Sequence, residues 1–157
     1  MADNLTPKDR RRTMQAVKAK GTKLEKRLWA MLAGMGLRGW KKNAETIVGK
    51  PDAAFVSQRL AIFVDGCFWH GCPHCRRKLP ETNRAYWEQK IRRNVRLAKT
   101  HNMQLSRDGW TIIRIWEHDI ADMRRIKSKI LNALQSKEPG SERRRQNGKP
   151  SHFKKVA

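Results

Sequence analysis

Residues 62–75 read Ile-Phe-Val-Asp-Gly-Cys-Phe-Trp-His-Gly-Cys-Pro-His-Cys, and this stretch decides both the fold and the chemistry that we expect. The apolar run at residues 60–64 ends abruptly at Asp65-Gly66, which is typical of a buried strand that stops in a turn. Residues 66–75 then hold all three cysteines of the chain, two of its five histidines and the pair Phe68-Trp69. A carboxylate, metal ligands and aromatic rings on one loop indicate that the functional site lies here.

A second apolar run, residues 53–56, precedes the first and is separated from it by Ser57-Gln58-Arg59. This spacing predicts an antiparallel hairpin, in which Asp52 at the start of one strand lies beside Asp65 at the end of its partner. Two carboxylates at neighbouring strand ends could share a divalent metal ion, which activates water and neutralises a phosphate. The alternative is that Asp52 is only a turn residue after Pro51.

The three cysteines have the spacing of a metal-binding cluster. Cys67, Cys72 and Cys75 form a C-x4-C-x2-C pattern, and two thiolates separated by two residues can bind one tetrahedral Zn2+. For the fourth ligand we prefer His118, which follows a predicted strand, to His74, whose side chain lies inside the Cys72-Cys75 knuckle. These ligands would form a closed structural site. The alternative is that the three cysteines are buried as small hydrophobic side chains.

Two further side chains are candidates for catalysis. His70 follows Asp65 by five residues, and with the other ligands assigned to the metal, its neutral imidazole could take a proton from water. A structural role is the alternative for this histidine. Glu25 also has two interpretations: it is the acid of a capping box with Thr22, which the spacing favours, or a carboxylate that faces the active site.

The remaining segments are expected to be helical, apart from one strand. A helix over residues 6–19 carries several basic residues, and a second helix starts at Thr22 and buries an apolar stripe. A long helix over residues 82–106 has a basic face, and a strand over residues 110–116 follows it. The last amphipathic helix takes in Ile120 and runs to about residue 134.

The charge of the chain indicates a nucleic-acid partner. The 157 residues suit one domain, and 36 Lys+Arg against 14 Asp+Glu give a formal net charge of +22, which repels itself unless a polyanion is near. No stretch approaches the ~20 apolar residues of a membrane span, and no signal peptide opens the chain, so we expect a cytoplasmic protein without a membrane partner. We expect a basic DNA-contacting helix in residues 1–20, a globular domain in residues 21–135 with a metal-pinned loop at 65–80, and a basic disordered tail in residues 136–157.

Several motifs together resemble those of the very-short-patch-repair (Vsr) mismatch endonucleases. They are Val64-Asp-Gly-Cys-Phe-Trp-His-Gly-Cys-Pro, Gly49-Lys-Pro-Asp52, Thr82-Asn83 with Tyr86-Trp87, Lys90 and Asn94, and Trp116-Glu-His118. The resemblance covers about residues 3–125. It implies a restriction-endonuclease-like α/β fold, with a central mixed sheet flanked by helices. It also implies a Mg2+-dependent nick on the 5′ side of the thymine in a T:G mismatch, in double-stranded DNA. Such an enzyme would act as a monomer with other proteins of a repair pathway, and members commonly accompany a cytosine-5 methyltransferase.

The resemblance also assigns roles by position. Asp52 is similar to the principal Mg2+ ligand of the family, with the backbone carbonyl of Val64 as a further ligand. His70 is similar to the general base, and Glu25 to an acid that orients metal-bound water.

Phe68, Trp69 and Trp87 resemble the aromatic residues that wedge into the duplex beside the mismatch. A mispair is weakly stacked, so inserting rings there costs less than in matched DNA.

The chain departs from the family pattern at two positions. Val64-Asp65 stands where the best-known members have Thr-His, so we expect Asp65 to do part of the work of that histidine or to bind metal. Ala98 stands where members usually carry an acid after the asparagine of the long helix. The alternative functions are a non-catalytic, zinc-dependent DNA-binding module and a nuclease with a different mismatch specificity.

Overall fold

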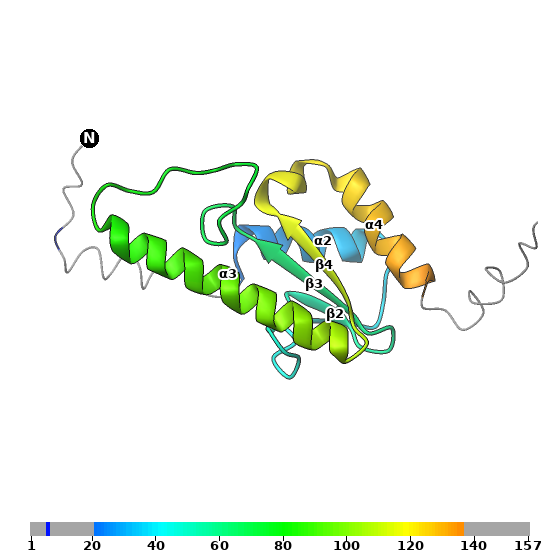
Figure 1. Ribbon diagram of the computed structural model, residues 1–157. Coiled ribbons are helices and arrows are strands. Elements are labelled where there is room, and N and C mark those ends of the chain that lie inside the picture. Colours follow the sequence, from blue (N-terminus) through cyan, green and yellow to red (C-terminus); the bar gives the residue numbers. More distant parts are fainter. Residues whose placement is uncertain (1–5, 7–20, 137–157) are drawn as a thin grey trace, which may run out of the picture.

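The computed structural model of the protein describes residue 6 and residues 21–136 (Figure 1). The helix expected over residues 6–19 and the tail expected after residue 136 therefore lie outside the described residues. No helix in the described part is long and apolar enough to cross a membrane.

Four strands of the described chain form one mixed sheet in the order β1-β2-β3-β4. β1 (Trp40–Lys42), β2 (Ala53–Phe55) and β3 (Leu60–Asp65) are antiparallel neighbours, and β4 (Thr111–Trp116) runs parallel to β3. The predicted hairpin is confirmed, with Ala53 opposite Ile62. β1 was not expected from the sequence, because this edge strand has exposed lysines and no alternation of apolar residues. The expected central mixed sheet is present.

The helices confirm most of the sequence pattern. α2 (Lys23–Gly34) starts with the expected capping box, and α3 (Arg84–Arg107) is the expected long basic helix. The final segment differs from the prediction, because Ile120 lies in a separate 3-10 helix, η1 (Glu117–Ala121), before α4 (Met123–Gln135). The physical reason is Asp122, whose side chain accepts a hydrogen bond from the backbone N–H of Arg125 and caps α4.

The sheet separates two hydrophobic cores. α2, η1 and α4 pack against one face, where they enclose Leu60 and Ile62 of β3, and α3 crosses the other face (Figure 1). Ala61 and Phe63 of β3 point to the α3 side, where they pack with Leu105. Because side chains alternate along a strand, Asp65 also lies on the α3 side of the sheet. The carboxyl end of β3 therefore presents its acid in the space between the sheet and α3.

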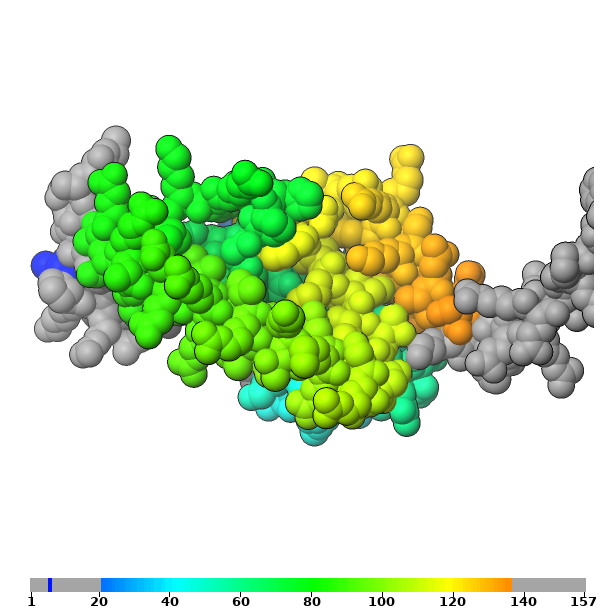
Figure 2. Space-filling view, viewed as in Figure 1, coloured from blue at the N-terminus to red at the C-terminus, as the bar shows by residue number. Residues whose placement is uncertain are grey.

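α3 is attached to the sheet near its C-terminal end only. Leu105 is its one buried residue, and the first half of the helix extends past the sheet beside the loop that follows β3 (Figure 1). Glu88 is the single acid of this helix, which otherwise carries arginines and lysines. In the space-filling view α3 lies across the front of the molecule, so these basic side chains occupy an open surface (Figure 2).

Candidate active site and metal centre

A cleft of about 810 Å³ lies between the start of α2, the carboxyl end of β3 and the middle of α3. All of the residues that the sequence analysis assigned to catalysis line it: Glu25, Asp52, Val64, Asp65 and His70. They come together because the antiparallel hairpin returns the start of β2 to the end of β3, as its register requires. The structure therefore brings the predicted site residues to one place.

Asp52 is held in this cleft through the neighbouring strand. Its Oδ2 accepts a hydrogen bond of 2.7 Å from the backbone N–H of Val64, and its own carbonyl accepts one of 2.9 Å from the Nε1–H of Trp29. Burial raises the pKa of Asp52 to about 6. The Val64 hydrogen bond opposes this shift, whereas the negative charges of Glu25 and Asp65 add to it. A half-buried carboxylate beside two other acids is a site where a cation would be bound favourably.

Asp65 has partners within the protein that the sequence analysis did not foresee. Its Oδ2 accepts a hydrogen bond of 2.8 Å from the Nε–H of Arg114, and its Oδ1 lies 3.7 Å from Nδ1 of His70. The side chain is only 4% exposed. Burial raises the pKa of Asp65, while His70 and Arg114 act in the opposite direction. Both carboxylate oxygens thus face groups of the same chain.

His70 is suited to accept a proton. Its half-buried imidazole lines the cleft, and its backbone N–H donates to the carbonyl of Gly66, which fixes the turn after β3. Burial lowers the pKa of His70, and Asp65 acts in the opposite direction. A lowered pKa keeps the imidazole neutral at pH 7, which is the form that a general base needs.

The structure shows that Glu25 completes the capping box and also lines the cleft. Its Oε1 accepts a hydrogen bond of 3.4 Å from the backbone N–H of Thr22, and its own backbone N–H donates one of 3.3 Å to the Thr22 hydroxyl. Its Oε2 also accepts one of 2.7 Å from the backbone N–H of Gly21. The cap was the interpretation that spacing favoured, and it is confirmed. Glu25 is 6% exposed and acts on Asp52 through its charge.

Cys67, Cys72, Cys75 and His118 form a cluster whose ligand atoms all lie within 4.8 Å of one another. Nδ1 of His118 is 3.2, 3.7 and 3.4 Å from the three sulfurs, in that order of cysteines. Atoms bound to one tetrahedral Zn2+ at about 2.0–2.3 Å would be about 3.5 Å apart, so the residues fit such an ion. Burial raises the pKa of Cys67 to about 11, a cost that a bound cation would offset.

The choice of His118 over His74 follows from the sheet. β4 runs parallel to β3 with Trp116 opposite Asp65, so the residues after β4 return to the loop that follows β3. His74 is not part of the cluster; its ring packs against that of His118 at a centroid distance of 5.9 Å. His118, and not His74, therefore lies with the three sulfurs because it follows the end of β4.

The aromatic residues of the loop and of α3 form one cluster beside the cleft. Phe68, Trp69 and Trp87 are half-buried, with ring centroids 5.2 to 5.7 Å apart, and Nζ of Lys90 lies 5.3 Å from the Trp69 ring. Asn94 of α3 donates a hydrogen bond of 3.0 Å to the Trp69 carbonyl. The rings are therefore held together by contacts between the loop and the part of α3 that extends past the sheet.

Comparison with known proteins gives a family for this arrangement. A family model described as DNA mismatch endonuclease Vsr matches residues 2–77. The type II nicking enzyme V.NmeDIP of Neisseria meningitidis serogroup C is 42% identical over 119 residues, which are 75% of this chain and 80% of that protein. The chain belongs to the Vsr family of DNA mismatch endonucleases.

Two further relatives agree with this family. The type II nicking enzyme V.XorIIP of Xanthomonas oryzae pv. oryzae is 35% identical over 135 residues, which are 85% of this chain and 98% of that protein. The DNA mismatch endonuclease Vsr of Escherichia coli K12 is 35% identical over 118 residues, which are 74% of each chain. As a Vsr-family member the protein is a DNA endonuclease, and the cleft is its candidate active site.

Two residues that line the cleft, Glu117 and Arg114, were given no role from the sequence. Glu117 accepts a hydrogen bond of 3.0 Å from the backbone N–H of Cys67, and Arg77 lies 3.6 Å from the same carboxylate oxygen. Arg114 contacts Asp65 from the middle of β4. The sequence predicts a central strand over residues 110–116, but β4 is at the edge of the sheet. A signal for Arg114 was still present, because an arginine between Ile113 and Ile115 of an apolar strand needs a partner where it is shielded from water.

Proposed function

We propose that this chain nicks double-stranded DNA on the 5′ side of the thymine in a T:G mismatch, in a Mg2+-dependent reaction. One observation carries the proposal: Asp52, Val64 and His70 line one cleft, and the aromatic cluster lies beside it. Membership of the Vsr family supports the mismatch substrate, and the motif resemblance supports the position of the nick and the metal requirement. The family membership favours an enzyme over a non-catalytic DNA-binding module.

In this proposal Asp52 and the backbone carbonyl of Val64 hold Mg2+. The fit is supported by the half-buried Asp52 carboxylate, whose pKa is raised to about 6 by burial and by the charges of Glu25 and Asp65. When bound, the ion supplies positive charge to the scissile phosphodiester and acidifies water. His70 accepts the proton of the attacking water, and Glu25 holds the start of α2 while its charge helps to orient that water.

Phe68, Trp69 and Trp87 are proposed to insert beside the mispair. Their edge-to-face packing keeps the rings in place before DNA binds, and a weakly stacked mispair opens at lower cost than a matched pair. The exposed basic residues of α3, and the basic segments 1–20 and 136–157, would contact the phosphate backbone.

We propose that Cys67, Cys72, Cys75 and His118 hold a structural Zn2+ that pins the loop at residues 65–80. The donor set and the compact cluster support this identity, since three thiolates and one imidazole are typical ligands of structural zinc. The loop carries Phe68, Trp69 and His70, so a metal ion in the cluster would hold these two aromatic rings and the proposed general base in place beside the cleft.

The wider features of the proposal follow from the family. We propose a restriction-endonuclease-like fold, which the mixed sheet with helices on both faces supports. We also propose a cytoplasmic, nucleoid-associated monomer that hands the nicked duplex to other proteins of a repair pathway. The family relation to DNA endonucleases supports this location.

The test is a nicking assay on a labelled duplex with one T:G pair. Wild type should nick the strand that carries the thymine with Mg2+ and not without it, and Asp52→Asn should abolish nicking. Asp108→Asn, which removes an exposed carboxylate at the end of α3, is the control and should nick like wild type. Absence of cleavage by the wild-type protein would favour a DNA-binding module. Equal cleavage of a matched duplex or of another mispair would refute the T:G specificity.

A further inference from the structure

Arg114 occupies an unusual place for a charged side chain. Its neighbours Ile113 and Ile115 point into the core with α2 and α4, so Arg114 points to the α3 side of the sheet. There its guanidinium carbon lies 4.6 Å from the ring centroid of Phe63, its register partner on β3, and the side chain is 21% exposed. A guanidinium that is mostly shielded from water is stable only where hydrogen-bond partners satisfy its N–H groups.

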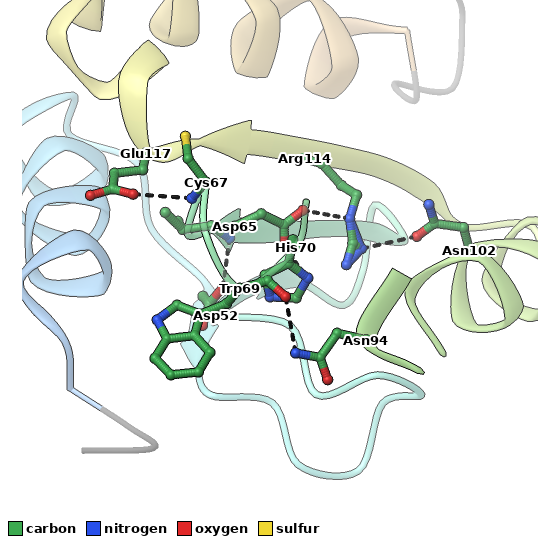
Figure 3. Close-up of polar contacts among 10 residues, drawn as sticks. Asp52, Asp65, Cys67, Trp69, His70, Asn94, Asn102, Arg114 and Glu117 are labelled. Atoms are coloured by element: carbon green, nitrogen blue, oxygen red, sulfur yellow. Dashed lines mark hydrogen bonds and ion pairs between the residues drawn. The ribbon is translucent and has the colours of Figure 1, made fainter. Parts of the chain in front are cut away.

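Those partners come from two different elements. The Nε–H of Arg114 donates to Oδ2 of Asp65 at 2.8 Å, and a terminal N–H donates to Oδ1 of Asn102 on α3 at 3.3 Å. Figure 3 shows Arg114 between these two side chains. The Asp65 oxygen that Arg114 binds is consequently beside a fixed positive charge, which opposes the binding of a metal cation at the same oxygen.

The other oxygen of Asp65 faces His70. Nδ1 of His70 is buried and has no hydrogen-bond partner in the described part of the chain, and Oδ1 of Asp65 lies 3.7 Å away. This distance exceeds a normal N–H···O hydrogen bond by about 0.8 Å, and such bonds at active sites often tighten only when the substrate is bound. A carboxylate oxygen can only accept, so it favours the tautomer with the proton on Nδ1.

We propose that Arg114 is a positioning residue of this endonuclease: it fixes Asp65 as the carboxylate that orients His70, rather than as a metal ligand. The Nδ1–H tautomer leaves Nε2 without a proton, and Nε2 is then the atom that takes the proton of the attacking water. A carboxylate that fixes the tautomer and direction of a histidine base is a known device of hydrolases. The inference rests on the proposed role of His70 as the base.

The test is designed to separate this role from general structural support. Arg114→Gln should lower kcat on the T:G duplex by about 10- to 100-fold, the size expected when a catalytic group is misplaced. KM should stay within about twofold, because the N–H groups of Arg114 are used on Asp65 and Asn102. Arg114→Lys should recover part of kcat, since its ammonium can reach Asp65 but cannot also bind Asn102 as a guanidinium does. Arg125→Gln on the exposed face of α4 is the control and should leave kcat unchanged.

A spectroscopic measurement on the full-length protein without DNA gives a readout apart from activity. The 15N shifts of the His70 ring, assigned with His70→Gln, should show the Nδ1–H tautomer at pH 8 in wild type. In Asp65→Asn the amide oxygen can still accept from Arg114, which turns the amide N–H2 toward His70. The ring should then switch to the Nε2–H tautomer, and kcat should fall while the Mg2+ concentration for half-maximal rate stays the same.

Three results would overturn the inference. They are an Nε2–H tautomer of His70 in wild type, an unchanged kcat in Arg114→Gln, or a large rise in the Mg2+ requirement of Asp65→Asn, which would make Asp65 a metal ligand. If Arg114→Gln does not fold, Asn102→Ala is the second variant, because it removes only the hydrogen bond between Arg114 and Asn102. This variant should still lower kcat by about threefold. An unchanged kcat in Asn102→Ala would also overturn the inference. Failure of the wild-type protein to nick would refute the proposed function instead. The tautomer of His70 would still show whether Asp65 orients the imidazole.

Discussion

Replacement of Asp52 by asparagine should stabilise the protein at neutral pH while it abolishes nicking. The pKa of Asp52 is about 6 in the folded protein, against an ordinary value of 3.8, because burial opposes its charge. The folded state therefore binds the proton more tightly than the unfolded state. The free energy of unfolding falls as the pH rises from about 4 to about 6, and stays at the lower level above that pH.

The size of this effect follows from the shift. A difference of about two pKa units corresponds to about 3 kcal/mol at pH 7.5, and to about half of that at pH 5. The asparagine amide oxygen can still accept the hydrogen bond from Val64, so this contact is kept. We expect Asp52→Asn to gain about 1–3 kcal/mol at pH 7.5, with a smaller gain at pH 5, because relaxation of the site reduces the full value.

The assay is urea unfolding in Mg2+-free buffer without a strong chelator, so that the metal cluster stays intact. Asp108→Asn is the control for loss of one negative charge, and its stability should change by less than about 0.5 kcal/mol. Added Mg2+ should stabilise wild type and leave the Asp52→Asn variant unchanged, because only wild type has the ligand. If Asp52→Asn is no more stable than wild type at pH 7.5, the Asp52 carboxylate does not pay the desolvation cost inferred from the structure, and the reasoning is refuted.

Three further predictions concern the metal, the DNA contacts and the aromatic cluster. Metal analysis should find about one Zn2+ per chain, which is lost in Cys72→Ser and retained in His74→Ala; loss in His74→Ala would contradict the assigned fourth ligand. Affinity for duplex DNA should fall by about 10³ or more between 50 and 200 mM salt, if at least six phosphates are contacted, and a change below about tenfold would argue against the basic surface. Trp87→Ala should weaken binding to the T:G duplex by about 10- to 100-fold, whereas Met103→Ala, exposed on the same helix, should not; equal losses would refute the wedge.

The sequence allowed the main elements of the site to be predicted because each depends on local spacing. The two apolar runs predicted the hairpin that joins Asp52 to the end of β3, and the cysteine spacing predicted the metal cluster. His118 lies next to the sulfurs in the structure because it follows a strand that returns beside β3. Short-range sequence patterns were therefore enough to predict which residues lie at the strand ends.

The contacts of Asp65 could not be predicted in the same way. They depend on the parallel register that places Arg114 opposite Phe63, two residues before Trp116 pairs with Asp65. Sequence patterns do not give that register, because β3 and β4 are far apart in the chain and joined through α3. For the same reason the hydrogen bond from Cys67 to Glu117 was missed, although both residues stood in recognised motifs.

The two residues that follow β4 have a consequence for how the enzyme responds to its surroundings. Glu117 accepts a hydrogen bond from the backbone of Cys67 beside the cleft, and the next residue, His118, belongs to the cluster with the three cysteines. One peptide bond therefore connects the cleft to the cysteine cluster. Cys75 is exposed, which leaves the sulfur cluster open to oxidants and to thiophilic cations such as Cd2+. Because Glu117 also lines the cleft, oxidation of the sulfurs would disturb the candidate active site, and we expect nicking by this protein to stop under oxidative stress before the chain unfolds.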